Sequence, residues 1–390
     1  MPEGTPDRER RARALAAGAI VAAAATSSRL GIANPLLVVA AAGSWRAWRL
    51  GALRGRPFAA PLLPPLVLFA VASLVSVVFS LDPLESADKL PRLLVLLLVP
   101  LAAALIDEVW WPRFVASFAV VTTVLAVWGI VQYVAGARDL EHRIQGPMSH
   151  YMLFAGWMLL GTCVVLAELL LNPRRKLWLL VPPAVLGSVA LLLSYTRNAW
   201  VGLTAGLLLL AAVWHRRLLL LYPVIFLAIW LVFPRPVLDR VVSIFDLRQS
   251  ANYDRVCMTI SGLQMVRDHP VTGVGLSMVA RVYPLYRRDD APRWHVPHLH
   301  NNVVQIAAER GLPALAIWLA FIALVAFDLL KGLGTPRTRA LSAGGLAAVV
   351  AMLTAGLFEY NFGDSEFHML FLVLITLPYA AAQTDEPVHR

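Results

Sequence analysis

Long apolar segments are the feature that most limits how this chain can fold. A hydrocarbon core of about 30 Å is crossed by roughly 20 apolar residues in a helix. Twelve segments approach or reach that length, at residues 14–28, 31–48, 61–81, 90–106, 114–135, 150–171, 177–195, 198–214, 218–234, 312–330, 340–357 and 367–383. We therefore predict an all-α, polytopic integral membrane protein with about 12 transmembrane helices. The first pair and the fourth segment are the weakest, which leaves eleven spans or a re-entrant piece as alternatives.

The composition supports this assignment. Of the 390 residues, 59% are hydrophobic and 15% are charged, whereas soluble proteins have about 45–50% and about 25%. The net charge of +10 could indicate nucleic acid, but the basic residues fall in loops, so we predict the lipid bilayer as a partner and no nucleic acid. Cys163 and Cys257 have no metal-type spacing.

The basic residues also predict an orientation. With the N-terminus inside, the inner segments hold 18 Lys and Arg and the short outer segments hold 6, a bias that sets topology in short loops. Both termini are then cytoplasmic. Arg8 to Arg13 before residues 14–28 resemble a secretory signal, and we interpret this region as an uncleaved first span because later spans already secure insertion.

One connection is far longer than the others. Residues 235–311 form an insert between spans nine and ten, on the outer face, within a single membrane domain of residues 1–390. Long loops of this kind are usually functional. We predict a helix over Asn252–Asp268 and a tight turn over Thr272–Gly275. A second helix should open at Pro297 and close at Gly311, which places His300 and Asn301 in a first turn suited to an anion.

Histidines gather at the end of this insert. His295, His298 and His300 lie within six residues, but their spacing matches no strong zinc pattern and no Cys or carboxylate stands beside them in sequence. We therefore predict no metal site and no cofactor. The carboxylates of the other outer loops, among them Glu359 and Asp364, are expected to be solvated, and His368 is expected to anchor at headgroup level.

Three arginines are candidates for binding an anion. Arg197 follows a tight turn between two apolar segments, where an ionisable residue is costly and usually functional. Arg143 precedes His150 in a short outer loop and could instead contact lipid headgroups. Arg255 follows Asp254 and could equally be solvated or paired with it. The chain has 31 Arg and 3 Lys, so arginine preference can also reflect coding bias.

Several of these motifs resemble the bacterial O-antigen ligase family. They are His300-Asn301 followed by Gly311-Leu312-Pro313, the stretch Ser194-Tyr195-Thr196-Arg197, and Asp254-Arg255 leading to Gly273-Val274-Gly275. The resemblance covers the whole topology, and its specific motifs lie in about the second half of the chain. It implies a fold similar to that of other multi-span, lipid-linked glycosyltransferases.

The resemblance also implies an activity and a site. Family members move a glycan from undecaprenyl diphosphate to a lipid A-core sugar on the periplasmic face of the inner membrane, without metal or ATP. By matching positions, Arg197, Arg255 and His300 would be catalytic. Arg143, His150, Asn301 and His298 would bind substrate, with looser correspondence. The arginines would hold the diphosphate, and His300 would accept a proton from the acceptor hydroxyl.

Other functions stay open on the sequence alone. An O-antigen polymerase or a protein O-oligosaccharyltransferase of the same superfamily would use the same type of donor. A transporter of an anionic lipid or solute would place ionisable residues near the bilayer midplane, whereas here the apolar segments are almost uncharged. A structural assembly factor without chemistry is a further alternative.

Overall fold

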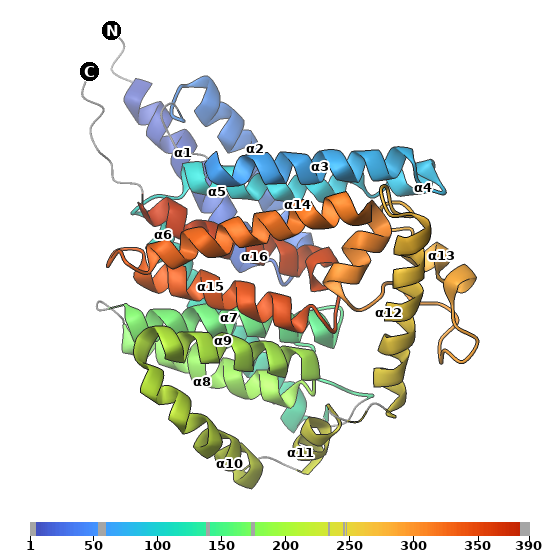
Figure 1. Cartoon of the computed structure of the whole chain (residues 1–390). Coiled ribbons are helices and arrows are strands. Elements are labelled where there is room, and N and C mark those ends of the chain that lie inside the picture. Colours follow the sequence, from blue (N-terminus) through green and yellow to red (C-terminus); the bar gives the residue numbers. More distant parts are fainter. Residues whose placement is uncertain are drawn as a thin grey trace.

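The structure, a computed structural model, describes residues 5–53, 60–137, 141–172, 176–232, 235–244, 246 and 248–382, and every regular element in these ranges is helical. The α-helices (Figure 1) are α1 (Thr5–Ala25), α2 (Leu30–Arg49), α3 (Leu63–Val78), α4 (Pro83–Ala87), α5 (Leu98–Leu105), α6 (Trp110–Val134), α7 (Tyr151–Leu171), α8 (Leu177–Leu193), α9 (Arg197–His215), α10 (Tyr222–Val232), α11 (Arg235–Val242), α12 (Ser250–Asp268), α13 (Val279–Tyr286), α14 (Asn302–Gly332), α15 (Arg339–Ala355) and α16 (Ser365–Ala382). Short 3-10 helices are η1 (Ala60–Leu62), η2 (Leu90–Leu97), η3 (Arg216–Leu221) and η4 (Asn361–Gly363).

The described residues of all twelve apolar segments lie mainly in helices, which confirms the all-α prediction for this part of the chain. Five helices are long and apolar enough to cross a membrane by themselves: Trp110–Val134, Tyr151–Leu171, Arg197–Leu220, Asn302–Gly332 and Ser365–Ala382. Shorter apolar helices are Leu63–Val78, Leu177–Leu193 and Arg339–Ala355. The chain thus has the build of a polytopic membrane protein, and the count of twelve spans stays a prediction.

The core is built on α7, α15 and α16. Side chains of α16 are buried along almost its whole length, and α15 packs against both α7 and α9. Small residues allow the close approach: a Cβ added to Gly344 would meet Val164 and Ala167 of α7 at 3.3 Å, and one added to Gly206 would meet the Cys163 sulfur at 2.8 Å. Such contacts drive helix association in lipid, where burial of apolar surface contributes little.

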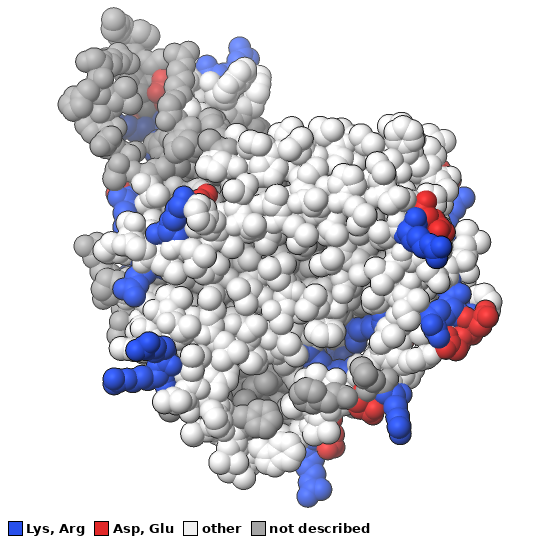
Figure 2. Space-filling view, in the orientation of Figure 1, with Lys and Arg blue, Asp and Glu red and all other residues white. Residues whose placement is uncertain are grey.

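The outer surface is apolar between two charged ends. Figure 2 shows a broad face without charged side chains, and most of the visible charged groups lie toward its edges. On α3, Val67, Leu74 and Val78 are exposed. At one end Arg13 pairs with Asp107, and elsewhere Arg281 pairs with Asp82. This pattern is that of a protein whose apolar belt faces hydrocarbon.

The segment between α10 and α14 covers one end of the bundle. Helix α12 runs across the ends of the apolar helices (Figure 1) and packs against α14 and α13. Its bounds, Ser250–Asp268, confirm the predicted helix at 252–268. Met258 and Met265 of α12 form a small core with Val282 and Tyr283 of α13 and with Leu299.

Two glycines join this covering segment to α14. Gly273 and Gly311 both have positive φ, of 68° and 81°. The Val274 amide donates to the Ala308 carbonyl at 2.8 Å, and the Leu312 amide donates to the Pro270 carbonyl at 2.8 Å. Gly311 interrupts α14, as predicted, and the chain re-enters the helix directly after it.

We expect Gly311→Ala to destabilise the protein by about 2 kcal/mol or more, because the new Cβ adds backbone strain and meets a carbonyl oxygen. That oxygen, of Val271, would lie 2.1 Å from the Cβ. The measurement is the thermal midpoint of purified protein in detergent. Gly31→Ala is the matched control, since nothing lies within 4 Å of its added Cβ. An unchanged midpoint for Gly311→Ala would show that this joint is not rigid.

Candidate active site

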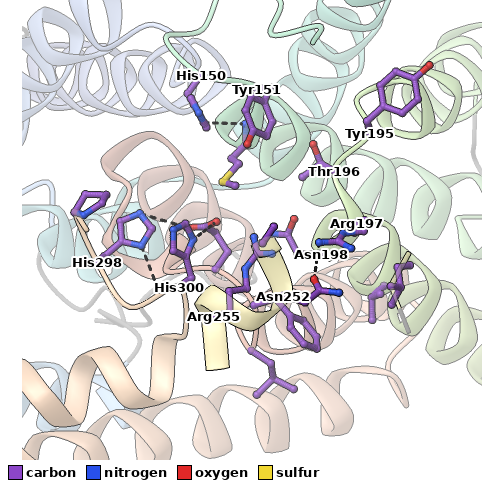
Figure 3. Close-up of a pocket in the computed structure, with 18 of the residues that line it drawn as sticks. His150, Tyr151, Tyr195, Thr196, Arg197, Asn198, Asn252, Arg255, His298 and His300 are labelled. Atoms are coloured by element: carbon purple, nitrogen blue, oxygen red, sulfur yellow. Dashed lines mark hydrogen bonds and ion pairs between the residues drawn. The ribbon is translucent and has the colours of Figure 1, made fainter. Parts of the chain in front are cut away.

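A pocket of about 800 Å³ lies at the end of the bundle that α12 crosses (Figure 3). Its walls come from the start of α7, the turn between α8 and α9, helices α11 and α12, and the loops before α14 and after α15. The residues that line it are Arg143, His150, Tyr151, Met152, Leu153, Tyr195, Thr196, Arg197, Asn198, Val201, Arg240, Ile244, Ala251, Asn252, Arg255, Val256, Thr259, Ile260, Arg293, Pro297, His298, His300, Leu357, Phe358, Glu359 and Asp364.

The start of α14 differs from the sequence prediction. The helix begins at Asn302, so the expected helix opening at Pro297 is wrong, and His300 lies outside the first turn. The Asn301 side chain caps the helix instead, because its Oδ1 accepts from the Val304 amide at 3.0 Å. His300 precedes the cap with φ at 52°, a conformation that non-glycine residues rarely adopt and that often marks functional sites.

Asn302 fastens the start of α14 to the loop between α15 and α16. Its amide donates to the Gly356 carbonyl at 2.7 Å. Its side-chain Nδ2 donates to Asn361 Oδ1 at 2.7 Å, and its Oδ1 accepts from the Phe362 amide at 3.2 Å. Asn301 Nδ2 adds a bond to the Leu357 carbonyl at 3.0 Å. We call this set of contacts the asparagine clasp; it holds residues 356–362 against His300.

The clasp brings Glu359 to the two histidines. His300 Nδ1 lies 2.9 Å from Glu359 Oε2, and His298 Nε2 lies 3.4 Å from Glu359 Oε1. Glu359 is 4% exposed, so its expected role as a solvated loop carboxylate is wrong. Asp364 is half-buried and also lines the pocket. The sequence missed this cluster because 58 residues separate Glu359 from His300 in the chain, and only helix packing joins them.

This cluster has the donor set of a possible metal site. The ligand atoms of His298, His300 and Glu359 lie within 4.8 Å of one another, so a carboxylate that is distant in sequence stands beside the histidines in space. His300 Nδ1 and Glu359 Oε2 are hydrogen-bonded to each other, and His298 Nε2 lies within ion-pair distance of Glu359 Oε1. The buried His300–Glu359 pair is thus satisfied without an ion, and metal independence stays a prediction.

The hydrogen bonds define the proton positions. His298 Nδ1 accepts from the His300 amide at 3.3 Å, so Nε2 carries the proton of neutral His298. Burial raises the pKa of Glu359, but the hydrogen bond with His300 and the charges of His300, His298 and Arg255 outweigh it and hold the pKa at about 2. The ionised carboxylate then accepts from His300 Nδ1–H. The Nε2 atom of His300 is left with its lone pair.

Arg197 is buried at the first position of α9 and is largely occupied by protein groups. Its Nη1 donates to the Ser243 carbonyl at 2.7 Å, to Ser243 Oγ at 3.1 Å and to Gln249 Oε1 at 2.5 Å. Its Nη2 donates to Asn252 Oδ1 at 2.6 Å. The preceding turn includes Tyr195, a buried residue with φ at 55°. Arg197 thus ties the end of α11 to the start of α12.

The other arginines of the pocket differ in their partners. Arg255 does not pair with Asp254, because that carboxylate pairs with Arg293 instead. Arg255 Nε is buried and has no hydrogen-bonding partner among the residues that the structure describes. The Arg143 guanidinium lies 4.2 Å from the centre of the Tyr151 ring. Burial, followed by the charge of Arg255, lowers the pKa of Arg143, with partial compensation from Tyr151.

The structure places most of the predicted site residues in one pocket. Arg143, His150, Arg197, Arg255, His298 and His300 all line it. Asn301 does not, because both of its polar side-chain atoms are engaged in the asparagine clasp. His368, expected at headgroup level, is buried against the Phe362 ring. Arg240, Arg293 and Glu359 line the pocket although no motif singled them out.

The geometry and the fold define a polytopic helical membrane protein with a basic pocket that contains a His–Glu pair. A family model described as O-antigen ligase matches residues 182–319. This match supports membership of the O-antigen ligase family, as the motifs predicted, and it includes Arg197, Arg255 and His300. Arg143 and Glu359 lie outside the matched range. No match was found among curated proteins.

We expect stability to fall between pH 7 and pH 4 partly through His298. Burial lowers the pKa of His298 to about 4, so below pH 6.5 the unfolded chain binds the proton first and the folded state loses up to about 3 kcal/mol. His298→Gln should flatten the dependence of the thermal midpoint on pH in this window. His295→Gln, at an exposed position, is the control and should keep the wild-type slope. Equal slopes for wild type and His298→Gln would contradict the buried neutral state.

Proposed function

We propose that the protein is an O-antigen ligase: a glycosyltransferase that moves a glycan from undecaprenyl diphosphate to a sugar of lipid A-core. The observation that carries this proposal is one pocket in which several guanidinium groups face a His–Glu pair. We place the pocket at the periplasmic face of the bacterial inner membrane, with both termini cytoplasmic. The family match supports lipid-linked glycan substrates in general; the donor, acceptor and orientation are our proposal.

The donor's leaving group is a lipid diphosphate, whose negative charge grows as its bond to the sugar breaks. Arg143, Arg197 and Arg255 line the pocket and supply positive charge there. Fixed donors directed at developing charge can each stabilise a transition state by about 3–4 kcal/mol. Arginine stays protonated and can donate two parallel hydrogen bonds to a phosphate. The proposed reaction therefore needs neither a divalent cation nor ATP.

The proposed reaction is a single displacement at the anomeric carbon. The acceptor hydroxyl oxygen forms the new bond to that carbon, its proton moves to His300 Nε2, and the bond to the diphosphate oxygen breaks with the electron pair leaving on undecaprenyl diphosphate. Glu359 holds the Nδ1–H of His300 and stabilises the imidazolium that forms. Attack from the face opposite the leaving group inverts the configuration.

The carboxylates of the pocket favour this one-step route over a covalent intermediate. Glu359 is engaged by both histidines. Burial, with the charges of Glu359 and Glu366, raises the pKa of Asp364 to about 8, so it is mostly protonated at neutral pH. A protonated carboxyl group is a poor nucleophile.

The rival functions differ from a ligase either in the acceptor of the glycan or in that they involve no chemical reaction. A polymerase would use a second lipid-linked glycan as acceptor, and a protein O-oligosaccharyltransferase would use a hydroxyl of a protein. A transporter needs a binding site near the bilayer midplane, whereas the charged residues of this pocket come from the segment between α10 and α14 and from the ends and connections of the apolar helices. A proton acceptor held by a buried carboxylate favours catalysis over transport.

Purified protein should transfer glycan from undecaprenyl diphosphate to lipid A-core in the presence of EDTA. The measurement is gel mobility and mass of the product, with a second lipid-linked glycan offered in parallel as the alternative acceptor. Elongation of the lipid-linked glycan alone would indicate a polymerase. Activity that EDTA abolishes and magnesium restores would contradict the metal-independent mechanism.

Binding and chemistry should separate in His300→Ala and Arg255→Lys. His300→Ala removes the proton acceptor but no guanidinium group, so we expect transfer to fall by about 10²-fold or more with donor affinity kept. Arg255→Lys keeps the charge but loses the planar fork, so donor affinity should fall.

Glu359→Gln should resemble His300→Ala in its transfer rate, because the tautomer of the His300 imidazole is no longer fixed. The measurements are donor affinity and transfer rate; a His300→Ala protein with wild-type rate would remove His300 from the mechanism.

A further inference from the structure

Arg240 is a pocket arginine that no sequence motif identifies. It lies near the end of α11, is half-buried and lines the same pocket as Arg255. Its only hydrogen bond among the described residues is a long one, from Nε to the Tyr195 carbonyl at 3.5 Å. No carboxylate in the described part of the chain lies within ion-pair distance of it. Its terminal nitrogens are therefore open to a ligand.

The other pocket arginines are more fully engaged, with one exception. Arg197 donates four hydrogen bonds to protein oxygens, and Arg293 pairs with Asp254. Arg255 is the exception, because within the described ranges it has no ion pair and its buried Nε has no hydrogen-bonding partner. Among the described residues, Arg240 and Arg255 thus form no ion pair and their terminal nitrogens have no protein acceptor, whereas Arg293 is neutralised by Asp254 through its Nε.

Arg197 is placed between the helices that carry these two residues. Its acceptors are Ser243, directly after α11, and Gln249 and Asn252, at the start of α12. Ser243 Oγ in turn donates to the Arg240 carbonyl at 2.7 Å, and Asn252 Nδ2 donates to the Ser243 carbonyl at 3.0 Å. This connected set of hydrogen bonds fixes the distance between α11 and α12.

The position of Arg240 is electrostatically unfavourable in the empty pocket. Burial lowers its pKa to about 10, and the charges of Arg197, Arg143 and Arg255 act in the same direction, with partial compensation from Tyr151. Like charges held together without a neutralising partner cost free energy. A ligand with two negative charges would remove that cost, which favours anion binding between these residues.

We propose that Arg240 and Arg255 are the residues that directly grip the diphosphate of the lipid donor, and that Arg197 positions them by fastening α11 to α12. This inference rests on the proposed function for the identity of the anion. It adds Arg240 to the substrate-binding residues and gives Arg197 a role in positioning in addition to its charge.

The probe that tests this proposal is undecaprenyl diphosphate without a sugar, bound by the purified full chain in detergent. Arg240→Gln should weaken binding about 10- to 100-fold, because charge-assisted hydrogen bonds are lost. Arg240→Lys should retain part of the affinity. Arg235→Gln is the matched control, because Arg235 lies on the same short helix, is exposed and does not line the pocket. The Arg235→Gln protein should bind undecaprenyl diphosphate with wild-type affinity.

Thermal stability separates the two roles. Arg240→Gln removes one of several like charges and no strong hydrogen bond, so its thermal midpoint should stay the same or rise. Arg197→Gln breaks the connection between α11 and α12, so it should lower both the midpoint and the affinity. If Arg240→Gln lowered the midpoint as much as Arg197→Gln does, Arg240 would be a structural residue and the proposal would be wrong.

The outcomes also distinguish this inference from the proposed function. If the wild type transfers glycan and Arg240→Gln binds undecaprenyl diphosphate within twofold of the wild-type affinity, the role of Arg240 is wrong and the proposed function stands. If the wild type binds the diphosphate through Arg240 but transfers no glycan, the ligase function is wrong and the proposed binding site stands. Absence of diphosphate binding by the wild type would overturn both.

Discussion

The structure of the site depends on the asparagine clasp between the start of α14 and the loop after α15. Asn302 uses its backbone amide and both side-chain polar atoms to hold that loop, and Asn301 caps the helix while adding a further bond. These contacts place Glu359 against His300. The imidazole can then keep one tautomer, since a buried carboxylate fixes the proton on Nδ1. A proton acceptor held in this way needs little reorganisation during a reaction.

A second connection, through Arg197, gives the pocket its opposite wall. Because Arg197 starts α9 and bonds to residues after α11 and at the start of α12, three helices meet at one guanidinium group. The open guanidinium edges of Arg240 and Arg255 then face the same space as His300. The pocket therefore combines two rigid walls, one cationic and one able to accept a proton, at the end of an apolar bundle. This division suits a substrate with an anionic lipid anchor and a neutral sugar.

Two of the three non-glycine residues with positive φ in the described part of the chain, Tyr195 and His300, line the pocket; the third, Ser277, does not. Elsewhere the bundle is held by small residues at helix contacts, such as Gly206 against Cys163 and Gly344 against Val164. Close packing of these helices supports the strained turns. The site is thus built from irregular backbone at the ends of regular helices.

The sequence by itself determined the helical, apolar build and helix α12, and its motifs, through the family resemblance, selected Arg197, Arg255 and His300 as candidate site residues, because apolar length and short motifs are local properties of the chain. It could not determine the start of α14, where the cap at Asn301 overrides the signal of Pro297. The partnership of Glu359 with His300 and the exposure of Arg240 to the pocket arise only when distant helices pack. Residue spacing along the chain carries no information on such contacts, so only the tertiary structure decided them.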